Sequence, residues 1–152
     1  MKTINVGIIG MGWMGTVHSR SYLAVKDKFF DQGIQARLVI CADNVAARGE
    51  EARARFGFEE STTNWMDVIN HPEVEVVDVT APNFLHREIT LAAIAAGKHV
   101  LCEKPVGLWP DDVAAVYHAA QEAGVMTYTG LNYRWVPVVQ YAKQLIEDGH
   151  LG

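Results

Sequence analysis

The chain has 152 residues, of which 49% are hydrophobic and 20% are charged, as in a globular domain large enough to bury a core. The formal net charge of −5 argues against non-specific binding to nucleic acid or to an anionic membrane surface. No apolar run is long enough to span a bilayer, and the apolar part of the amino-terminal stretch is too short for a signal peptide.

Short apolar runs alternate with longer amphipathic segments along the chain. We predict strands over residues 3–9, 36–42, 75–80, 99–102 and 126–130, with a weaker one at 58–62. We predict helices over residues 13–26, 45–56, 64–70, 86–96, 111–123 and 137–148. This alternation predicts an α/β fold of the Rossmann type, with a doubly wound, mainly parallel sheet and helices on both faces.

Several helix ends carry residues suited to them. Asn44 and Asp111 are expected to cap the helices that follow them, and Pro137 is a favourable first-turn residue for the last helix. Glycines are expected to end helices at positions 57, 97, 124 and 149. The elements therefore have defined limits.

The first predicted strand runs into the glycine-rich stretch GIIGMGWMG, which has the spacing G-x-G-x-x-G. Gly10 permits a tight turn, Gly12 lets a pyrophosphate approach the backbone, and Gly15 lets the helix pack close to the strand. The following helix offers unpaired N–H groups and a partial positive charge to phosphates. We therefore expect a dinucleotide to bind at a loop made of Gly10, Met11, Gly12, Trp13, Met14 and Gly15.

Asp43 ends the second long apolar run, RLVICAD. An acid at this place accepts hydrogen bonds from the adenosine ribose hydroxyls and repels a 2′-phosphate, so NAD is favoured over NADP. Two alternatives stay open. Asp43 could share the capping of the next helix with Asn44, and Arg48 could meet the phosphate of NADP.

Three further polar segments follow predicted strands. They are TAPNFLH (80–86), EKP (103–105) and NYR (132–134). Each also has a plainer interpretation: a structural histidine at 86, a surface turn at 103–105, and a loop anchored by Trp135. However, the carboxyl ends of parallel strands share one sheet edge, so these segments are expected to converge with Gly10 and Asp43 on one ligand site.

The two cysteines, Cys41 and Cys102, are isolated within apolar runs. They lack the Cys-x-x-Cys spacing of a zinc site, and two such residues make no disulfide framework. We expect buried free thiols, which suit a reducing cytoplasm, and no metal site.

With these motifs in hand, the sequence resembles the amino-terminal domain of the Gfo/Idh/MocA oxidoreductases, the family of glucose–fructose oxidoreductase and inositol dehydrogenase. The similarity runs from VGIIGMGWMG through APNFLH, AGKHVLCEKP and GLNYRW to LIEDGHLG. AGKHVLCEKP is the most specific element and the glycine spacing the least. The resemblance implies oxidation, or the reverse reduction, of a hydroxyl-bearing carbon on a sugar, cyclitol or related molecule with NAD(P).

The resemblance also implies site residues. Lys104 would be catalytic, pointing at the substrate hydroxyl and the nicotinamide ribose, with Glu103 and Pro105 holding the turn. The remaining cofactor contacts would come from Thr80, Ala81, Pro82, Asn83, His86, Asn132 and Arg134. Two roles for Lys104 stay open: a proton relay if its pKa is lowered, or an electrostatic anchor if Glu103 pairs with it and keeps it charged.

Family members continue into a second α/β domain that supports oligomerisation and supplies a histidine and most substrate contacts. We therefore expect residues 1–152 to be the cofactor domain of a longer homo-oligomer, inactive or weakly active alone. The alternative is a sensor that binds a dinucleotide without chemistry. Retention of EKP argues against it, because a sensor has no need of Lys104.

Overall fold

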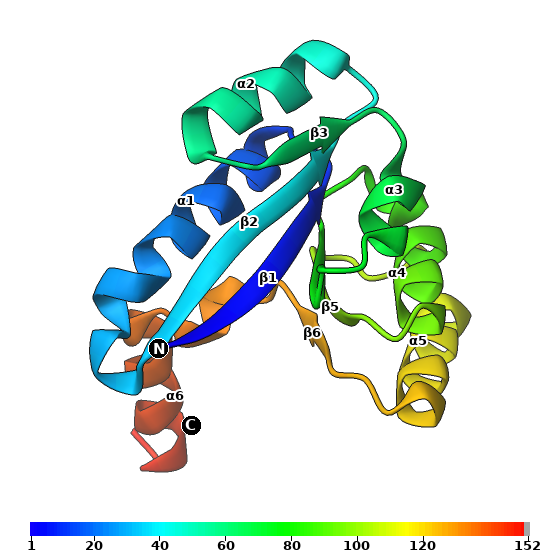
Figure 1. The fold of residues 1–152 in the computed structure, drawn as a ribbon. Coiled ribbons are helices and arrows are strands. Elements are labelled where there is room, and N and C mark those ends of the chain that lie inside the picture. Colours follow the sequence, from blue (N-terminus) through cyan, green and yellow to red (C-terminus); the bar gives the residue numbers. More distant parts are fainter. Residues whose placement is uncertain (151–152) are drawn as a thin grey trace.

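The computed structural model describes residues 1–150, so the last two residues of the predicted 1–152 domain lie outside the described part. Six strands form one sheet in the order β3-β2-β1-β4-β5-β6, and every neighbouring pair is parallel (Figure 1). The strands are β1 (Lys2–Ile9), β2 (Ile34–Ala42), β3 (Glu60–Thr62), β4 (Val76–Val79), β5 (His99–Cys102) and β6 (Thr127–Thr129). This confirms the Rossmann-type prediction.

Helices cover both faces of the sheet (Figure 1). The helices are α1 (Trp13–Lys28), α2 (Ala46–Phe56), α3 (Trp65–Asn70), α4 (His86–Ala95), α5 (Pro110–Ala123) and α6 (Pro137–Glu147). Three short 3-10 turns, which were not predicted, are η1 (Phe30–Gln32), η2 (Asn83–Leu85) and η3 (Asn132–Trp135). Helices α1 and α2 lie on one face, and α3, α4 and α5 on the other. Every predicted helix and strand is present, with ends within two residues of those expected.

The β-branched residues of the central strands explain why the sheet is buried on both sides. Val6 and Ile8 of β1 belong to one core cluster with α2, while Ile9 belongs to a second cluster with α3, α4 and α5. Val77 and Val79 of β4 are fully buried. Alternate side chains of a strand point to opposite faces, so two apolar layers form and the strand ends stay free for a ligand.

The start of α2 differs from the prediction. Its N-cap position is Val45, not Asn44, and Val45 supplies no side-chain hydrogen bond. The backbone amide of Val45 donates instead to Oδ1 of Asp43 at 2.9 Å, because the short aspartate side chain folds back over the turn. Asp43 therefore takes part in the turn before α2, but it does not share the capping of this helix with Asn44.

The start of α5 also corrects the prediction. Asp111 is not its cap, because the helix opens one residue earlier at Pro110, with Trp109 as the N-cap. Proline at the first position presets the helical φ angle and needs no N–H partner. Oδ2 of Asp112 accepts the amides of Leu108 and Trp109 at 3.0 and 3.1 Å and closes the turn. Pro137 opens α6 as predicted, and the glycines at 57, 97, 124 and 149 adopt positive φ at or just after helix ends.

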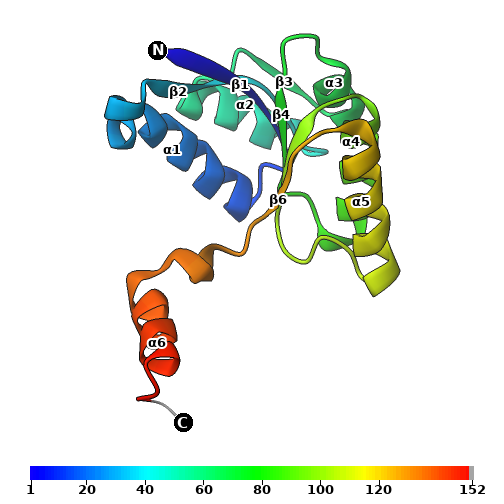
Figure 2. The same ribbon diagram turned by 90° about the horizontal axis from the view of Figure 1, so that it is seen from below.

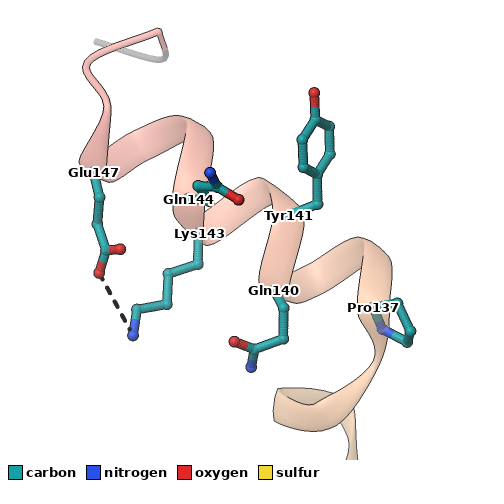
Figure 3. A pocket seen from close by; sticks show the side chains of 6 residues that line it. All are labelled: Pro137, Gln140, Tyr141, Lys143, Gln144 and Glu147. Atoms are coloured by element: carbon teal, nitrogen blue, oxygen red, sulfur yellow. Dashed lines mark ion pairs between the residues drawn. The ribbon is translucent and has the colours of Figure 1, made fainter.

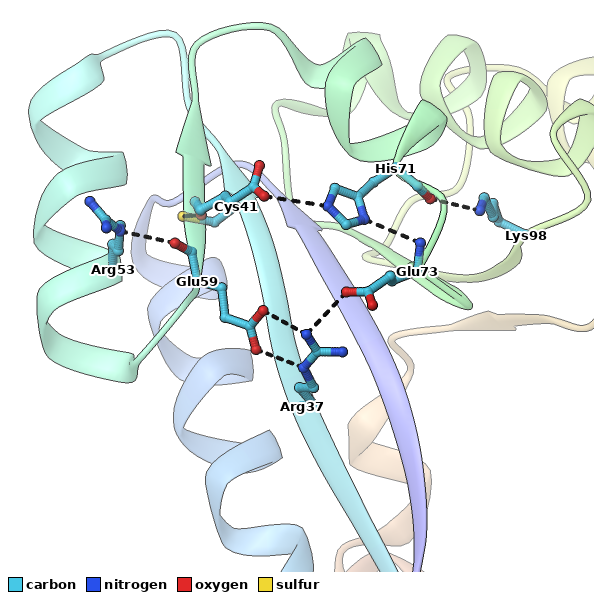
Figure 4. Close-up of polar contacts among 8 residues, drawn as sticks. Arg37, Cys41, Arg53, Glu59, His71, Glu73 and Lys98 are labelled. Carbon is cyan, nitrogen blue, oxygen red and sulfur yellow. Dashed lines mark hydrogen bonds and ion pairs between the residues drawn. The ribbon is translucent and has the colours of Figure 1, made fainter.

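A cluster of ion pairs links the segments that enter the sheet (Figure 4). Both Nε and Nη2 of Arg37 donate to the carboxylate of Glu59 at 2.6 Å, and Nη2 also reaches Glu73 at 3.0 Å. Glu59 precedes β3 and Glu73 precedes β4, so these charges lie away from the carboxyl ends of the strands. They are exposed and contribute little to stability. The cluster is structural and separate from the predicted ligand edge.

Helix α6 projects away from the sheet (Figure 2), and none of its residues is buried. A hollow along it is lined by side chains of this helix alone, including Lys143 and Glu147, which pair at 3.5 Å (Figure 3). A hollow made by one helix is a surface groove and carries no site. Within residues 1–150, no helix combines the length and the apolar character needed to cross a membrane.

Candidate active site

A cavity of about 450 Å³ lies at the carboxyl ends of β1, β2 and β4. This is where the strand order reverses, with β2 on one side of β1 and β4 on the other, and open α/β sheets bind ligands at such a point. The predicted residues that line the cavity are Gly10, Gly12, Trp13, Met14, Asp43, Thr80, Ala81 and Pro82. Three of the five segments expected to converge therefore meet at this cavity, whereas no residue of 103–105 or 132–134 lines it.

The glycine loop is held by the strands on both sides of it. The amide of Gly10 donates to the carbonyl of Ala42 at 2.7 Å, and the hydroxyl of Thr80 donates to the carbonyl of Gly10 at 2.6 Å. Gly10 has φ +99°, and a Cβ there would lie 2.6 Å from the backbone nitrogen of Ala81. Only glycine fits this close approach, so the turn depends on it.

Gly12 is the N-cap of α1 and behaves differently. A Cβ built on it would meet nothing within 4 Å, so its backbone faces open space at the cavity. The first turn of α1 contains no acidic residue, so its partial positive charge is not neutralised. An accessible backbone, an unneutralised helix end and a cavity beside them fit the pyrophosphate of a dinucleotide.

Asp43 also lines the cavity, next to the glycine loop, and is only 7% exposed. Its Oδ2 accepts the amide of Met11 at 2.8 Å, and its Oδ1 accepts the amide of Val45 at 2.9 Å. A carboxylate has about four acceptor positions, so capacity for ribose hydroxyls remains. Arg48, which also lines the cavity, approaches Oδ1 of Asp43 at 3.7 Å. Both the NAD interpretation and the NADP alternative therefore have a residue in place. Met11 itself is buried and contributes its backbone only.

His86 does not line the cavity. Its ring is 1% exposed and lies between two backbone carbonyls, that of Ala81 at 2.7 Å and that of Pro105 at 2.6 Å. The ring thus joins the turn after β4 to the EKP turn after β5. This arrangement corresponds to the structural interpretation of His86. Asn83 is exposed at the start of η2 and lies outside the cavity wall.

Glu103 and Lys104 follow β5 but point in different directions. Glu103 is 6% exposed, and its Oε2 accepts the backbone amide of Lys104 at 3.2 Å. Its Oε1 lies 3.3 Å from Nε2 of His18. Lys104 is exposed and forms no ion pair within residues 1–150. Glu103 therefore does not pair with the Lys104 ammonium. The Lys104–Pro105 peptide bond is cis.

Asn132 and Arg134 are not brought to the cavity. Both lie on η3, where every residue is exposed, and this segment leads away from the sheet toward α6 (Figure 2). The backbone carbonyl of Arg134 accepts a hydrogen bond from the side-chain amide of Gln140 in α6.

Some lining residues were not among the predicted ones. They are Asn44, Arg48, Thr63, Trp65 and Phe84, together with the apolar floor of Ile9, Ala42, Leu85 and Ile89. Thr63 and Trp65 follow β3, so their place after a strand is the signal that marks them in the sequence. Arg48 is the residue named above as a phosphate contact for NADP. His18, one turn after the glycine loop, carried no distinguishing pattern.

The cysteines are buried and free, as expected. Burial is the main cause that raises the pKa of Cys41 to about 12 and that of Cys102 to about 11. Both thiols therefore stay protonated at neutral pH and are poor nucleophiles. Among residues 1–150, no group of three or more His, Cys, Asp or Glu side chains is arranged to hold a metal ion.

The sequence is similar to those of known oxidoreductases. Residues 4–131 match the family profile described as the oxidoreductase family with an NAD-binding Rossmann fold (GFO_IDH_MocA). The chain is 42% identical to levoglucosan dehydrogenase of Pseudarthrobacter phenanthrenivorans, over 100% of this chain and 39% of the relative. It is 35% identical to the scyllo-inositol 2-dehydrogenase (NADP(+)) of Bacillus subtilis, over 99% of this chain and 39% of the relative.

The fold is also similar to those of solved structures. A levoglucosan dehydrogenase in complex with NADH and levoglucosan superposes with a TM-score of 0.90 at 39% identity, over 99% of this chain and 41% of that one. The chain spans about two fifths of the length of the relatives that it matches. On the profile match, the strand order and these similarities, the chain belongs to the Gfo/Idh/MocA family of oxidoreductases and has its NAD-binding Rossmann fold.

Proposed function

We propose that this chain is the dinucleotide-binding part of an oxidoreductase that transfers a hydride between NAD and a hydroxyl-bearing carbon of a sugar, cyclitol or related small molecule. The observation that carries the proposal is the convergence of the glycine loop, Asp43 and the Thr80–Pro82 turn on one cavity at the reversal of strand order. Relatives named as levoglucosan and inositol dehydrogenases support the substrate class.

The residues of the cavity have distinct parts in this proposal. The backbone at Gly12 and the start of α1 bind the pyrophosphate, and Asp43 orients the adenosine ribose. The bound nicotinamide supplies the hydride-accepting carbon. Lys104, free of Glu103, is available to hold or receive the proton of the substrate hydroxyl.

We also propose that most substrate contacts lie outside residues 1–152, in a further part of a longer, homo-oligomeric protein. Relatives more than twice as long support this division. The buried free thiols suit a reducing compartment, and we place the protein in the cytoplasm.

Isothermal titration of this chain with NAD and with NADP tests the proposal. We expect NAD to bind more tightly, because Asp43 repels a 2′-phosphate. Arg48→Ala serves as the matched variant, since Arg48 is the one cation among the described residues that line the cavity, and its loss should weaken NADP more than NAD. Absence of binding of both dinucleotides at millimolar concentration would refute the proposal.

A further inference from the structure

A buried ionic network lies beneath the glycine loop and the EKP turn. Nδ1 of His18, on α1, lies 2.8 Å from Oδ2 of Asp78 on β4, and Nε2 lies 3.3 Å from Oε1 of Glu103. The side chains are 14% exposed for His18, 0% for Asp78 and 8% for Glu103. Two carboxylates are therefore held on opposite edges of one imidazole ring.

These two contacts bear on whether the His18 ring carries one proton or two. A neutral imidazole has one N–H, so its other nitrogen would turn a lone pair toward a carboxylate oxygen. Each nitrogen–oxygen contact needs a proton between its two atoms, and when both carboxyl groups are ionised only an imidazolium supplies both protons. Unlike charges within hydrogen-bond distance in a buried place favour the charged ring.

The electrostatics of His18 agree with the geometry. Burial, the largest single influence, lowers the pKa of His18. The hydrogen bond to Asp78 and the charges of Asp78 and Glu103 oppose it, and together they raise the pKa above 6.5. Oδ1 of Asp78 has no hydrogen-bond partner within residues 1–150, so His18 is the main compensation for this buried acid.

We propose that His18, as an imidazolium, is a positioning residue that holds the carboxylate of Glu103 in place and thereby sets the backbone of Lys104. The inference deepens the proposed function, because Lys104 is the group assigned to the substrate proton. His18 touches neither substrate nor cofactor in this role. It acts through Glu103, whose other oxygen accepts the Lys104 amide at 3.2 Å.

The surroundings leave Glu103 little freedom. A Cβ at Gly130, just after β6, would collide with Oε1 of Glu103, so the β6 side of the carboxylate is closed. If Nε2 of His18 lost its proton, its lone pair would face the Glu103 carboxylate. No positive charge would then lie between the carboxylates of Glu103 and Asp78. Glu103 would then be repelled, and the turn that carries Lys104 would shift.

Asp78 faces the ring directly; burial raises the pKa of its carboxyl group, and the hydrogen bond to His18 and the charge of His18 oppose that rise. Burial and the charge of Asp78 raise the pKa of Tyr22, which lies one turn after His18 on α1. Burial raises the pKa of Cys102, at the end of β5, to about 11. Tyr22 and Cys102 stay neutral at neutral pH, and the ring of His18 loses its charge as the pH rises through its raised pKa.

Nuclear magnetic resonance of the whole chain tests the proposal. The ring carbon–proton signal of His18 is followed against pH, together with the backbone amide signal of Lys104. We expect His18 to titrate above 6.5 and the Lys104 amide to move with the same midpoint. In His18→Gln the neutral side chain cannot titrate, so the Lys104 amide should lose this pH dependence while the chain stays folded.

Two further variants complete the design. In Glu103→Gln one of the two anions is removed, so the midpoint of His18 should fall; this readout holds even where His18→Gln does not fold. His118→Gln, an exposed change on α5, is the control and should leave the Lys104 amide titration as it is. A His18 midpoint at or below 6.5, or a Lys104 amide that titrates equally in His18→Gln, would overturn the inference.

Titration of the unchanged chain with NADH, run in parallel, separates this inference from the proposed function. If NADH fails to bind while the Lys104 amide follows His18, the function fails and the network stands. If NADH binds while the amide ignores His18, the network fails and the function stands.

Discussion

The carboxylate of Asp43 accepts a hydrogen bond of 2.8 Å from the backbone amide of Met11. The residue expected to select the cofactor is therefore also an anchor of the loop expected to bind its phosphates. One buried side chain therefore joins the expected ribose contact to the glycine loop. Changes at Asp43 should consequently affect stability and binding together.

Asp43→Ala removes the acceptor of two backbone amides, those of Met11 and Val45. We expect the free energy of unfolding to fall by about 1–3 kcal/mol, the usual cost of leaving buried groups unsatisfied. The affinity for NAD should fall roughly tenfold or more, because each lost charged hydrogen bond contributes about 1.5–3 kcal/mol. Urea denaturation and calorimetric titration measure the two effects. Unchanged NAD affinity would remove the ribose assignment.

Gly10 and Gly12 should respond differently to alanine. Gly10→Ala places a methyl group 2.6 Å from the backbone of Ala81 at φ +99°, so we expect a loss of stability of several kcal/mol, on the order of 2–4. Gly12→Ala meets no atom within 4 Å, so stability should change by less than about 0.5 kcal/mol.

The same Gly12 methyl would stand where a pyrophosphate is expected, so dinucleotide affinity should fall roughly tenfold or more. Thermal melts with and without NAD separate stability from binding. Without NAD, Gly12→Ala and the unchanged chain should have the same melting temperature. On addition of NAD, the melting temperature of Gly12→Ala should rise less. Equal stabilisation by NAD in Gly12→Ala and the unchanged chain would show that the phosphates bind elsewhere.

The raised pKa of His18 makes stability depend on pH. Because the folded pKa lies above the unfolded value of 6.5, His18 contributes stability that is fully present below 6.5 and is lost as pH rises through the folded pKa. Asp78 acts in the same direction, since burial raises its folded pKa above 3.8. The folded chain should therefore be less stable at about pH 9 than at about pH 6.

Urea denaturation at these two pH values measures the loss, with His118→Gln as the control. The difference between them should shrink in His18→Gln, which has no proton to release at this site. A difference that is as large in His18→Gln would assign the pH dependence to another group.

Lys104 is tested in a form of the protein that also carries the substrate-binding part. Lys104→Ala should lower kcat by about 100-fold or more, the usual contribution of a group that transfers a proton, and leave the Kd of NAD nearly unchanged. Lys104→Arg keeps the charge but cannot release a proton. Recovery of kcat in Lys104→Arg would favour an electrostatic anchor, whereas no recovery would favour a proton relay. An effect of Lys104→Ala on NAD binding alone would favour a dinucleotide sensor.

Much of the fold could be predicted, because short stretches of sequence indicate where each strand and helix begins and ends. The strands are unbroken apolar runs, and glycines at 57 and 124 end helices with positive φ. The two caps at Asn44 and Asp111 were wrong because neighbouring residues compete. Asp43 accepts the amide of Val45, two residues ahead, and Asp112 accepts that of Leu108, four residues behind, and these bonds decide the local geometry.

The site was predictable where position alone determines it. The glycine loop, Asp43 and Thr80–Pro82 each follow a strand, and the parallel sheet brings them together. Contacts between segments could not be predicted in this way. The direction of the Glu103 side chain depends on His18, which lies 85 positions earlier in the chain, and nothing in the local sequence of either residue indicates the other.

The steric fit of Gly130 against Glu103 has a consequence for how this domain could diverge. Any side chain at 130 would push the acid out of its place between the imidazole and the turn amide. A change at 130 therefore requires the Glu103 side chain to move, or a shorter residue at 103. Positions 103 and 130 form a linked pair across β5 and β6, so drift at either one is restrained by the other.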